Sequence, residues 1–458
     1  MSLKVFSVKI RLSIFVLLLL SISSCLKAPE TIKDIVDLRQ DHAAYLNDSV
    51  KVKDLLTAEA QSQADEDYNI IYFSVWHQRQ PFYALPDRVH LDFIKFGVNP
   101  GFGENKLRHS KDWLKKLKQN AFLNNYPNAE YAVITTRNTS LRSLPTQRPH
   151  FNSAKGDSAS WPFDNLQRSS VAANTPIFVC HISADKSWAL VETSFTFGWM
   201  PAKDFARVDT GFIKTWEAGR YAVITRDQTS ILDEGGSFIL KASLGYIFPL
   251  INETAGNLEV LAAVAGKNNN AVIKHGFVSL EMSAVKPLRL TSLAAVKIAN
   301  ELIGEPYGWG GLYGNRDCSS MTRDFFAPFG IWLPRHSEDQ VKEVGSYVNL
   351  QGLDPEQKEK IILEKGVPYL SLLWRKGHVM LYIGEHNGRA LIFHNIWGIK
   401  TKDLTGKEGR KIIGQAVITT LRPGDELRCI DPEGGTLLKA ITVMNILVPE
   451  KLNQDQNR

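Results

Sequence analysis

A repeat with a constant offset restricts the fold of this chain more than any other feature of its sequence. Tyr131–Thr135 reads YAVIT and recurs unchanged, 90 residues later, as Tyr221–Thr225. Each copy opens a segment of short β-type runs that Gly, Asn, Asp and Pro interrupt, which is the pattern of a small barrel. The sequence therefore predicts two β-barrels of one kind, at residues 126–207 and 215–287.

Both copies end on a strand of glycine, an aromatic residue and a hydrophobic residue. The first has Gly198-Trp199-Met200 and the second has Gly276-Phe277-Val278, and this ending resembles bacterial SH3-like domains. Two such barrels are expected to bind or orient something rather than to carry chemistry. The first copy also contains Trp161–Gln167, an insertion that a minimal barrel does not need. This insertion either reaches towards a neighbouring domain or simply packs.

The first 25 residues have the organisation of an export signal. The stretch Lys4–Arg11 contains three basic residues and precedes the apolar run Ile14–Leu20. This run is shorter than the ~20 apolar residues of a comfortable membrane span. Small residues follow, and Ile22–Cys25 resembles a bacterial lipobox, in which the cysteine becomes the lipidated first residue of the mature protein.

We therefore expect a lipoprotein signal peptide at residues 1–25 and an exported protein that a lipid on Cys25 anchors to the membrane. Leu26, rather than Asp, follows the cysteine. In Gram-negative lipoproteins this implies the periplasmic side of the outer membrane. The alternative is an ordinary secretory signal with an incidental cysteine.

Length and composition are typical of a multidomain globular protein. The 458 residues are too many for one core. The net charge of +6 is mild and forms no basic stripe, so nucleic acid is not an expected partner. Residues 26–125 are predicted to be mostly helical and irregular, with Ser110 as a helix N-cap. Neither a zinc ribbon nor a disulfide framework is predicted, because no Cys-x-x-Cys spacing occurs among Cys25, Cys180, Cys318 and Cys429.

From Ser292 onwards the pattern changes to helices followed by strands. Leu293–Leu302 has the apolar spacing of an amphipathic helix, and a second helix is predicted from Cys318 to Phe326, after the glycine-rich turn Tyr307–Gly311. Residues 290–450 are therefore expected to form an α+β domain, with helices packed on an antiparallel sheet. Its expected strands are 379–383, 390–394, 416–420 and 440–447.

Cys318 is the candidate nucleophile of this domain. At a helix start a thiol lies near unpaired N–H groups and the positive end of the helix dipole. Such a setting lowers the pKa of a thiol from about 8.5 towards roughly 4–7, particularly beside a histidine. We therefore expect a lowered pKa for Cys318.

His378 and His394 are the candidate histidines, and the turn between their strands decides whether they can serve one site. Side chains alternate between the two faces of a sheet. A two-residue turn at Asn387-Gly388 with regular pairing would put the histidines on opposite faces. A three-residue loop, His386-Asn387-Gly388, would put both on one face. We therefore predict the three-residue loop.

Together these residues predict a cysteine hydrolase without a cofactor or metal. Cys318 attacks, His378 takes its proton and returns it to the leaving amine, and His394 holds the imidazole in its tautomer. The Cys318 N–H is the candidate oxyanion donor. The alternatives are a buried structural cysteine, a core histidine at position 394, and a zinc site made from the one cysteine and the two histidines.

Four short motifs resemble the NlpC-type family of papain-like bacterial cell-wall cysteine peptidases. They are Pro306–Gly311, Asp317-Cys318-Ser319, Leu333-Pro334-Arg335 and Gly377-His378-Val379. The resemblance spans about residues 290–425. The two SH3-like domains and the N-terminal segment, which would have a stabilising role, resemble the fuller architecture of one branch of this family.

The resemblance implies a γ-D-glutamyl-L-diamino acid endopeptidase that acts on peptidoglycan stem peptides, usually at meso-diaminopimelate. It also implies that Tyr307 lines the substrate site and that Asp317 and Ser319 help to hold the peptide. Ser320 stands where the family usually has Gly, and its small side chain should be tolerated.

Phe163–Gln167 and Arg142–Thr146 resemble the first barrel of that branch, which walls off one end of the groove and favours stems with a free N-terminal L-alanine. Asp164 is the acid that we expect to recognise this ammonium, because a buried charge needs a partner. Such an enzyme would trim released peptides. Two other classes stay open, a non-catalytic wall-binding lipoprotein with an inactive site, and an amidase or acyltransferase with the same thiol chemistry.

Overall fold

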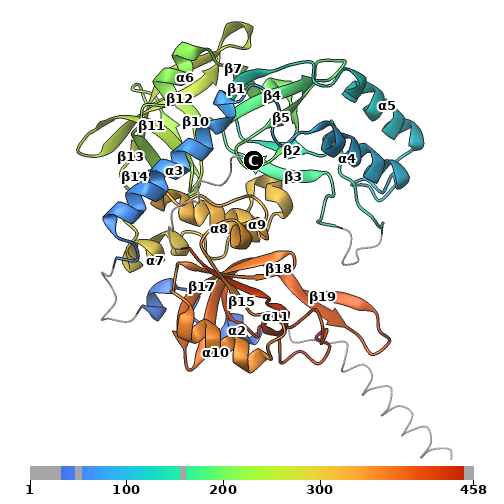
Figure 1. Ribbon diagram of the computed structural model, residues 1–458, viewed down its shortest axis with the longest axis vertical. Coiled ribbons are helices and arrows are strands. Elements are labelled where there is room, and N and C mark those ends of the chain that lie inside the picture. The colour runs from blue at the N-terminus through green and yellow to red at the C-terminus, as the bar shows by residue number, and fades with distance from the viewer. Residues whose placement is uncertain (1–31, 47–53, 155–160, 448–458) are drawn as a thin grey trace, which may run out of the picture.

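The computed structural model describes residues 32–46, 54–154 and 161–447. It contains an N-terminal group of helices, two SH3-like sheets and a C-terminal domain in which helices pack on an antiparallel sheet (Figure 1). The predicted fold class is therefore confirmed. Cys25, the predicted lipidation site, lies outside the described residues. In the part of the chain that the structure describes, no helix is long and apolar enough to cross a membrane.

The N-terminal helices run along the rest of the molecule. The longest of them, α3, crosses both barrels (Figure 1). Trp76 near its end donates a hydrogen bond to the carbonyl of Val133 in the first barrel, at 2.8 Å. Gln61 near its start donates to the carbonyl of Phe329 in the C-terminal domain, at 3.0 Å. The helices are α2 (Lys33–Asp37), η2 (His42–Tyr45), α3 (Ala58–His77), α4 (Pro86–Val98), α5 (Lys111–Ala121) and η4 (Leu123–Asn125).

The two barrels have one topology, as the repeat predicts. The strand order β3-β2-β6-β5-β4-β1-β7 of the first recurs position by position in the second as β10-β9-β13-β12-β11-β8-β14. The repeated segments form the equivalent strands β1 and β8. The first barrel consists of β1 (Tyr131–Thr135), β2 (Thr139–Arg142), β3 (Gln167–Val171), β4 (Pro176–Ile182), β5 (Trp188–Glu192), β6 (Phe197–Pro201), η5 (Ala202–Asp204) and β7 (Phe205–Arg207). Helix α6 (Thr210–Trp216) leads to the second, which consists of β8 (Tyr221–Ile224), β9 (Thr229–Leu232), β10 (Phe238–Ala242), β11 (Ile247–Glu253), β12 (Asn257–Ala265), η6 (Lys267–Asn269), β13 (Ala271–Ser279) and β14 (Ser283–Lys286).

The C-terminal domain is built on a six-stranded antiparallel sheet with the order β15-β20-β16-β17-β18-β19. Alternate residues of its strands enter two different cores, as a sheet that is covered on both faces requires. Leu381 packs with Phe325 of α8 on one face, and Met380 packs with Ile362 of α10 on the other. The elements are α7 (Ser292–Asn300), η7 (Trp309–Gly314), α8 (Cys318–Phe326), η8 (Ala327–Phe329), α9 (Asp339–Lys342), β15 (Ser346–Asn349), α10 (Pro355–Lys365), β16 (Ser371–Arg375), β17 (His378–His386), β18 (Arg389–Lys402), β19 (Glu408–Thr420), α11 (Leu437–Ala440) and β20 (Val443–Ile446).

The connection between β17 and β18 differs from the predicted one. His386 pairs with Arg389, so the turn has two residues, Asn387 and Gly388. Both have positive φ, 52° and 74°, as the tight hairpin turn that fits the strand twist requires. The prediction of a three-residue loop is therefore wrong.

A bulge in β17 restores the register that this loop was expected to provide. Glu385 pairs with Ala390, but beyond an irregularity between Tyr382 and Gly384 the partner of Leu381 is Phe393. One extra residue in one strand shifts the pairing by one position and exchanges its faces. As a result, the two histidines come to one face even though the turn is short.

Candidate active site

Asp317 caps the helix that carries the candidate nucleophile. One of its carboxylate oxygens accepts the N–H of Ser320 at 2.8 Å, and the Ser320 hydroxyl in return accepts the N–H of Asp317 at 2.9 Å. The other oxygen accepts the N–H of Gly310 at 3.1 Å. This capping box fixes where α8 begins, and the contact to Gly310 holds the glycine-rich turn against the helix start.

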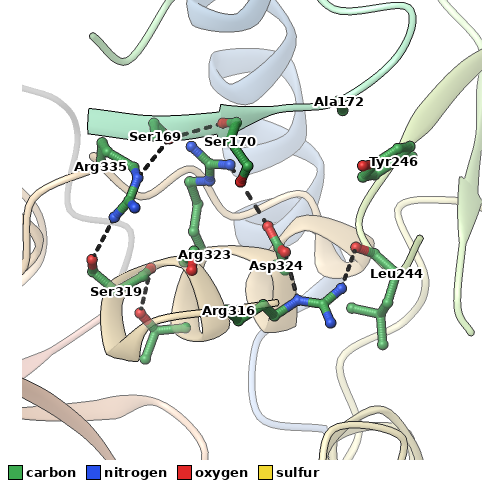
Figure 2. A network of polar contacts seen from close by, with 12 residues as sticks. Ser169, Ser170, Ala172, Leu244, Tyr246, Arg316, Ser319, Arg323, Asp324 and Arg335 are labelled. Carbon is green, nitrogen blue, oxygen red and sulfur yellow. Dashed lines mark hydrogen bonds and ion pairs between the residues drawn. The ribbon is translucent and has the colours of Figure 1, made fainter. Parts of the chain in front are cut away.

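Arg335 balances the negative charge of Asp317. Its guanidinium donates to Asp317 at 2.7 Å, to the hydroxyl of Ser319 at 2.8 Å and to the hydroxyl of Ser169 in the first barrel at 2.8 Å. Figure 2 shows Arg335 between Ser319 on α8 and Ser169 on β3. Burial opposes the ionisation of Asp317, but the positive charge and hydrogen bonds of Arg335, with those from Ser320, lower its pKa to about 2. The ion pair is therefore held at every pH of interest.

These contacts define what Asp317 and Ser319 do. Asp317 is 7% and Ser319 5% exposed, and both Asp317 oxygens already accept hydrogen bonds within the described part of the chain. The structure gives them a positioning role for α8. Their expected direct contact with the peptide stays a prediction.

Cys318 lies at the first position of α8 and beside the strand of the candidate base. Its Sγ accepts a hydrogen bond from the N–H of Val379, the residue after His378. Burial, followed by the negative charge of Asp317, raises the pKa of the Cys318 thiol to about 12. The expectation of a lowered pKa is therefore wrong, because burial outweighs the hydrogen bonds from the N–H groups of Val379 and Ser319. At neutral pH the group is a thiol that needs a base at the moment of attack.

A chain of hydrogen bonds fixes the tautomers of the two histidines. The Thr419 hydroxyl donates its single proton to the Thr420 carbonyl at 2.8 Å, so it can only accept from Nε2 of His394, 3.1 Å away. His394 then carries its proton on Nε2, and its Nδ1 accepts from Nε2 of His378 at 2.9 Å. This leaves the Nδ1 of His378 unprotonated. It is the nitrogen that can take a proton from a thiol.

Both histidines are neutral at pH 7. Burial, then the charges of His394 and Arg375, lower the pKa of His378 well below 6.5, and burial lowers the pKa of His394 to about 3. Across the described residues there is no group of three or more side chains placed to hold a metal. The arrangement can accept one proton and return it, which is general acid–base chemistry.

The insertion in the first barrel reaches the C-terminal domain. The ring of Phe163 lies 5.1 Å from Trp309, 6.5 Å from Tyr307 and 6.1 Å from Trp397. The indole N–H of Trp309 donates to the carbonyl of Asp164 at 3.1 Å. Of the two alternatives for Trp161–Gln167, contact with a neighbouring domain is therefore confirmed. Tyr307 is half-buried in this group of aromatic rings, and burial, followed by the charges of Cys318 and Asp317, raises its pKa.

The carboxylate of Asp164 is not a free acid. It forms a buried ion pair with Arg142 at 2.7 Å and accepts the N–H groups of His150 at 2.9 Å and Leu166 at 3.0 Å. The side chain is 3% exposed. These contacts shape the insertion, so the expectation that Asp164 recognises a substrate ammonium is corrected to a structural role.

Arg316 and Thr419 are important residues that sequence reasoning missed. Arg316, directly before the Asp317 cap, bonds Asp324 of α8 at 2.7 Å and Asp227 of the second barrel at 2.8 Å. Figure 2 shows its contacts with Asp324 and with the carbonyl of Leu244. No local pattern in the sequence marks either residue, because their partners are distant in the chain.

Comparisons with known proteins agree with this geometry. Four family models match the chain. They are the NLPC_P60 stabilising domain, N term (residues 12–126), the SH3 domain of SH3b1 type (149–201), the SH3 domain of SH3b2 type (209–255) and the NlpC/P60 family (304–411). The chain belongs to the NlpC/P60 family. This is a family of peptidoglycan endopeptidases, and Cys318 and His378 both lie within residues 304–411.

One solved structure supports the NlpC/P60 assignment along most of the chain. A structure described as an NlpC/P60 endopeptidase from Photobacterium damselae subsp. piscicida is 26% identical, with a TM-score of 0.80 over 90% of this chain and 97% of that one. An NlpC/P60 family protein from Bacillus cereus is 18% identical, with a TM-score of 0.46 over 69% of this chain and 100% of that one. No curated protein matches the chain.

Proposed function

We propose that this NlpC/P60 protein hydrolyses the bond between γ-D-glutamate and a diamino acid in peptidoglycan stem peptides through Cys318, His378 and His394. The observation that carries the proposal is the chain Thr419–His394–His378, which leaves Nδ1 of His378 unprotonated, on the residue before the Val379 N–H that binds Sγ of Cys318. His378 removes the thiol proton as Sγ attacks the amide carbon. The Cys318 N–H, the first of α8, is the proposed donor to the oxyanion. The same proton then goes to the departing amine, and water releases the acyl group.

The test compares wild type with Cys318→Ala on L-Ala-γ-D-Glu-meso-diaminopimelate, with products identified by mass. Wild type should release L-Ala-γ-D-Glu and diaminopimelate, and the variant should release neither. Release of free alanine would instead identify an amidase-like cut. Turnover that survives in Cys318→Ala would reject the thiol mechanism, and a wild type without turnover would favour the wall-binding alternative.

The proposed substrate is a released peptide with a free N-terminal L-alanine. Its support is the contact of Phe163 with Tyr307 and Trp309, which brings the first barrel against the glycine-rich turn before Cys318. The acid that would face the ammonium is no longer Asp164. Digesting intact sacculi and free tripeptide side by side tests the proposal. We expect cleavage of the tripeptide only, and equal rates on both would contradict it.

The proposed location is the cell envelope, with a lipid on Cys25. The basic and apolar segments before this residue support it. Labelling cells with a radioactive fatty acid should mark the wild type and leave Cys25→Ser unmarked. A protein that remains unlabelled in both forms would point to an ordinary secretory signal.

A further inference from the structure

Two arginines of the C-terminal domain border the candidate site and form no ion pair with an acid of the described residues. Arg375 ends β16 and lies directly opposite His378 in the register, so the two side chains share one face. Arg410 lies on β19, with its guanidinium 5.8 Å from the ring of Phe163. The charge of Arg410 lowers the pKa of Arg375 and also acts on Tyr307. One arginine therefore lies beside the candidate base and the other beside the aromatic rings.

Their hydrogen-bonding capacity is largely unused. The Nε atoms of Arg375 and Arg410 are buried and have no partner among the described residues. Each guanidinium has one long bond to a carbonyl, Arg375 to Gly434 at 3.3 Å and Arg410 to Gly398 at 3.5 Å. The negative charge of Asp431 acts to raise the pKa of Arg375, and that of Glu408 acts to raise the pKa of Arg410. Neither acid forms an ion pair with its arginine.

This differs from the other buried arginines beside the site. Arg316 and Arg335 each bond a carboxylate at 2.7 Å. Arginine keeps its charge in proteins, and a partly buried charge is costly without a counter-charge. Arg375 and Arg410 are half-buried, and their planar forks fit a carboxylate in a bidentate manner. Lys400, directly opposite Arg410, adds a third cation to the same face.

The position of Arg375 indicates which part of the substrate would supply the anion. If the proposed function holds, His378 returns its proton to the departing amine, so the leaving group lies beside His378. Arg375 is the cross-strand neighbour of His378. A diamino acid such as diaminopimelate carries a carboxylate on its side chain, whereas lysine carries only an ammonium there.

We propose that Arg375 and Arg410 form a subsite that binds the side-chain carboxylate of the departing diamino acid and selects diaminopimelate over lysine. This inference rests on the proposed function and names the substrate class of the same site. No bond forms or breaks at the two arginines. They hold the leaving group while Cys318 and His378 act.

The experiment compares L-Ala-γ-D-Glu-meso-diaminopimelate with the same peptide amidated at the side-chain carboxylate. Arg375→Gln and Arg410→Gln are tested beside Lys411→Gln, a matched control whose side chain lies next to Arg410 on the opposite face. For wild type we expect kcat/KM on the amidated peptide to be about 10–100-fold lower, as for a lost charge-assisted hydrogen bond. In each arginine variant, kcat/KM should fall by a similar factor on the acid peptide and change little on the amidated peptide. Lys411→Gln should behave as wild type.

Equal losses of kcat/KM on both peptides in the arginine variants would overturn the proposal. A loss that depends on the glutamate carboxylate, rather than on the side-chain carboxylate of the diamino acid, would also overturn it. A second measurement separates this result from failure of the proposed function. Full-length Cys318→Ala, with and without Arg410→Gln, is titrated with both peptides. Weaker binding of the acid peptide alone in the double variant supports the subsite even if wild type hydrolyses neither peptide. Unchanged binding of the acid peptide overturns it.

Discussion

The protonation states of Cys318 and His378 predict an unusual pH profile. The proposed mechanism requires a neutral His378, whose pKa lies well below 6.5 because of burial and the charges of His394 and Arg375. Protonation therefore begins to remove the base only at low pH, and kcat/KM on the tripeptide should change little between pH 8 and pH 6. Circular dichroism at each pH serves as the folding control. A fall in kcat/KM centred at pH 6.5 or above would contradict the burial of this imidazole.

Thr419 is predicted to position the pair of histidines without touching substrate. Thr419→Val removes the acceptor for Nε2–H of His394 while preserving shape, so the other tautomer becomes accessible. We expect kcat to fall by up to about 10-fold, the value of one hydrogen bond, with KM nearly unchanged. Thr419→Ser keeps the hydroxyl and should restore most of the rate. Equal loss in both variants would indicate a packing role instead.

At the level of single residues, sequence reasoning named the candidate nucleophile and histidines but not the residues that hold them in place. Cys318 and His378 stand in short motifs, and a helix start or strand end can be recognised locally. Thr419 and Arg316 act through partners elsewhere in the chain, so no spacing in the sequence reveals them. Asp164 shows the opposite error. Its acidic side chain suggested a free ligand, but the fold brings Arg142 to 2.7 Å.

The β17–β18 hairpin shows what sequence patterns decide for whole elements. Strand alternation correctly required the two histidines to share a face, and Asn387-Gly388 correctly marked the turn. The sequence could not locate the extra residue, because a bulge is fixed by packing on both faces of the sheet. The shift of one residue that places both histidines on one face therefore occurs within the strand, between Tyr382 and Gly384, and not in the loop.

Gly384 carries the conformational requirement of this bulge. Its φ of 126° is one that L side chains rarely adopt. Gly384→Ala should lower the free energy of unfolding by about 1–3 kcal/mol, measured by urea denaturation, and should reduce activity by disturbing the register of His378. Gly97→Ala is the control, because it lies in α4 with open space around the added methyl group and should be slightly stabilising. Equal stability of Gly384→Ala and wild type would show that the bulge tolerates a side chain.

On the scale of the whole molecule, the repeat and the composition predicted the set of domains but not how they join. The contacts between domains use buried polar groups, such as Arg335 with Ser169 and Gln167 with the carbonyl of Gly310, 2.9 Å apart. Hydrophobic periodicity contains no information about such contacts. The first barrel thereby reaches the glycine-rich turn, and the second reaches the residue before the helix cap through Asp227 and Arg316.

Arg316 is the residue through which domain assembly affects the site most directly. It is 5% exposed and bonds carboxylates from the second barrel, from α8 and from the segment before Tyr307. Burial and the hydrogen bond with Asp227 raise the pKa of Glu305 to about 8, so this group already holds a proton near neutral pH. Arg316→Ala leaves three half-buried carboxylates without their cation. We expect it to lower the free energy of unfolding by about 3–5 kcal/mol at pH 8, the range for a broken buried pair.

The same substitution has a predicted pH dependence. Without the cation, the pKa of these carboxylates in the folded state rises above the unfolded value, so the folded variant binds more protons than the unfolded chain. Its stability then falls as pH rises, and the deficit should be smaller at pH 5.5 than at pH 8. Urea unfolding at both pH values measures this. Arg220→Ala removes an exposed pair with Glu253 and should cost no more than about 1 kcal/mol at either pH. A deficit for Arg316→Ala that is the same at both pH values would mean that lost packing, rather than uncompensated charge, destabilises the junction of the domains.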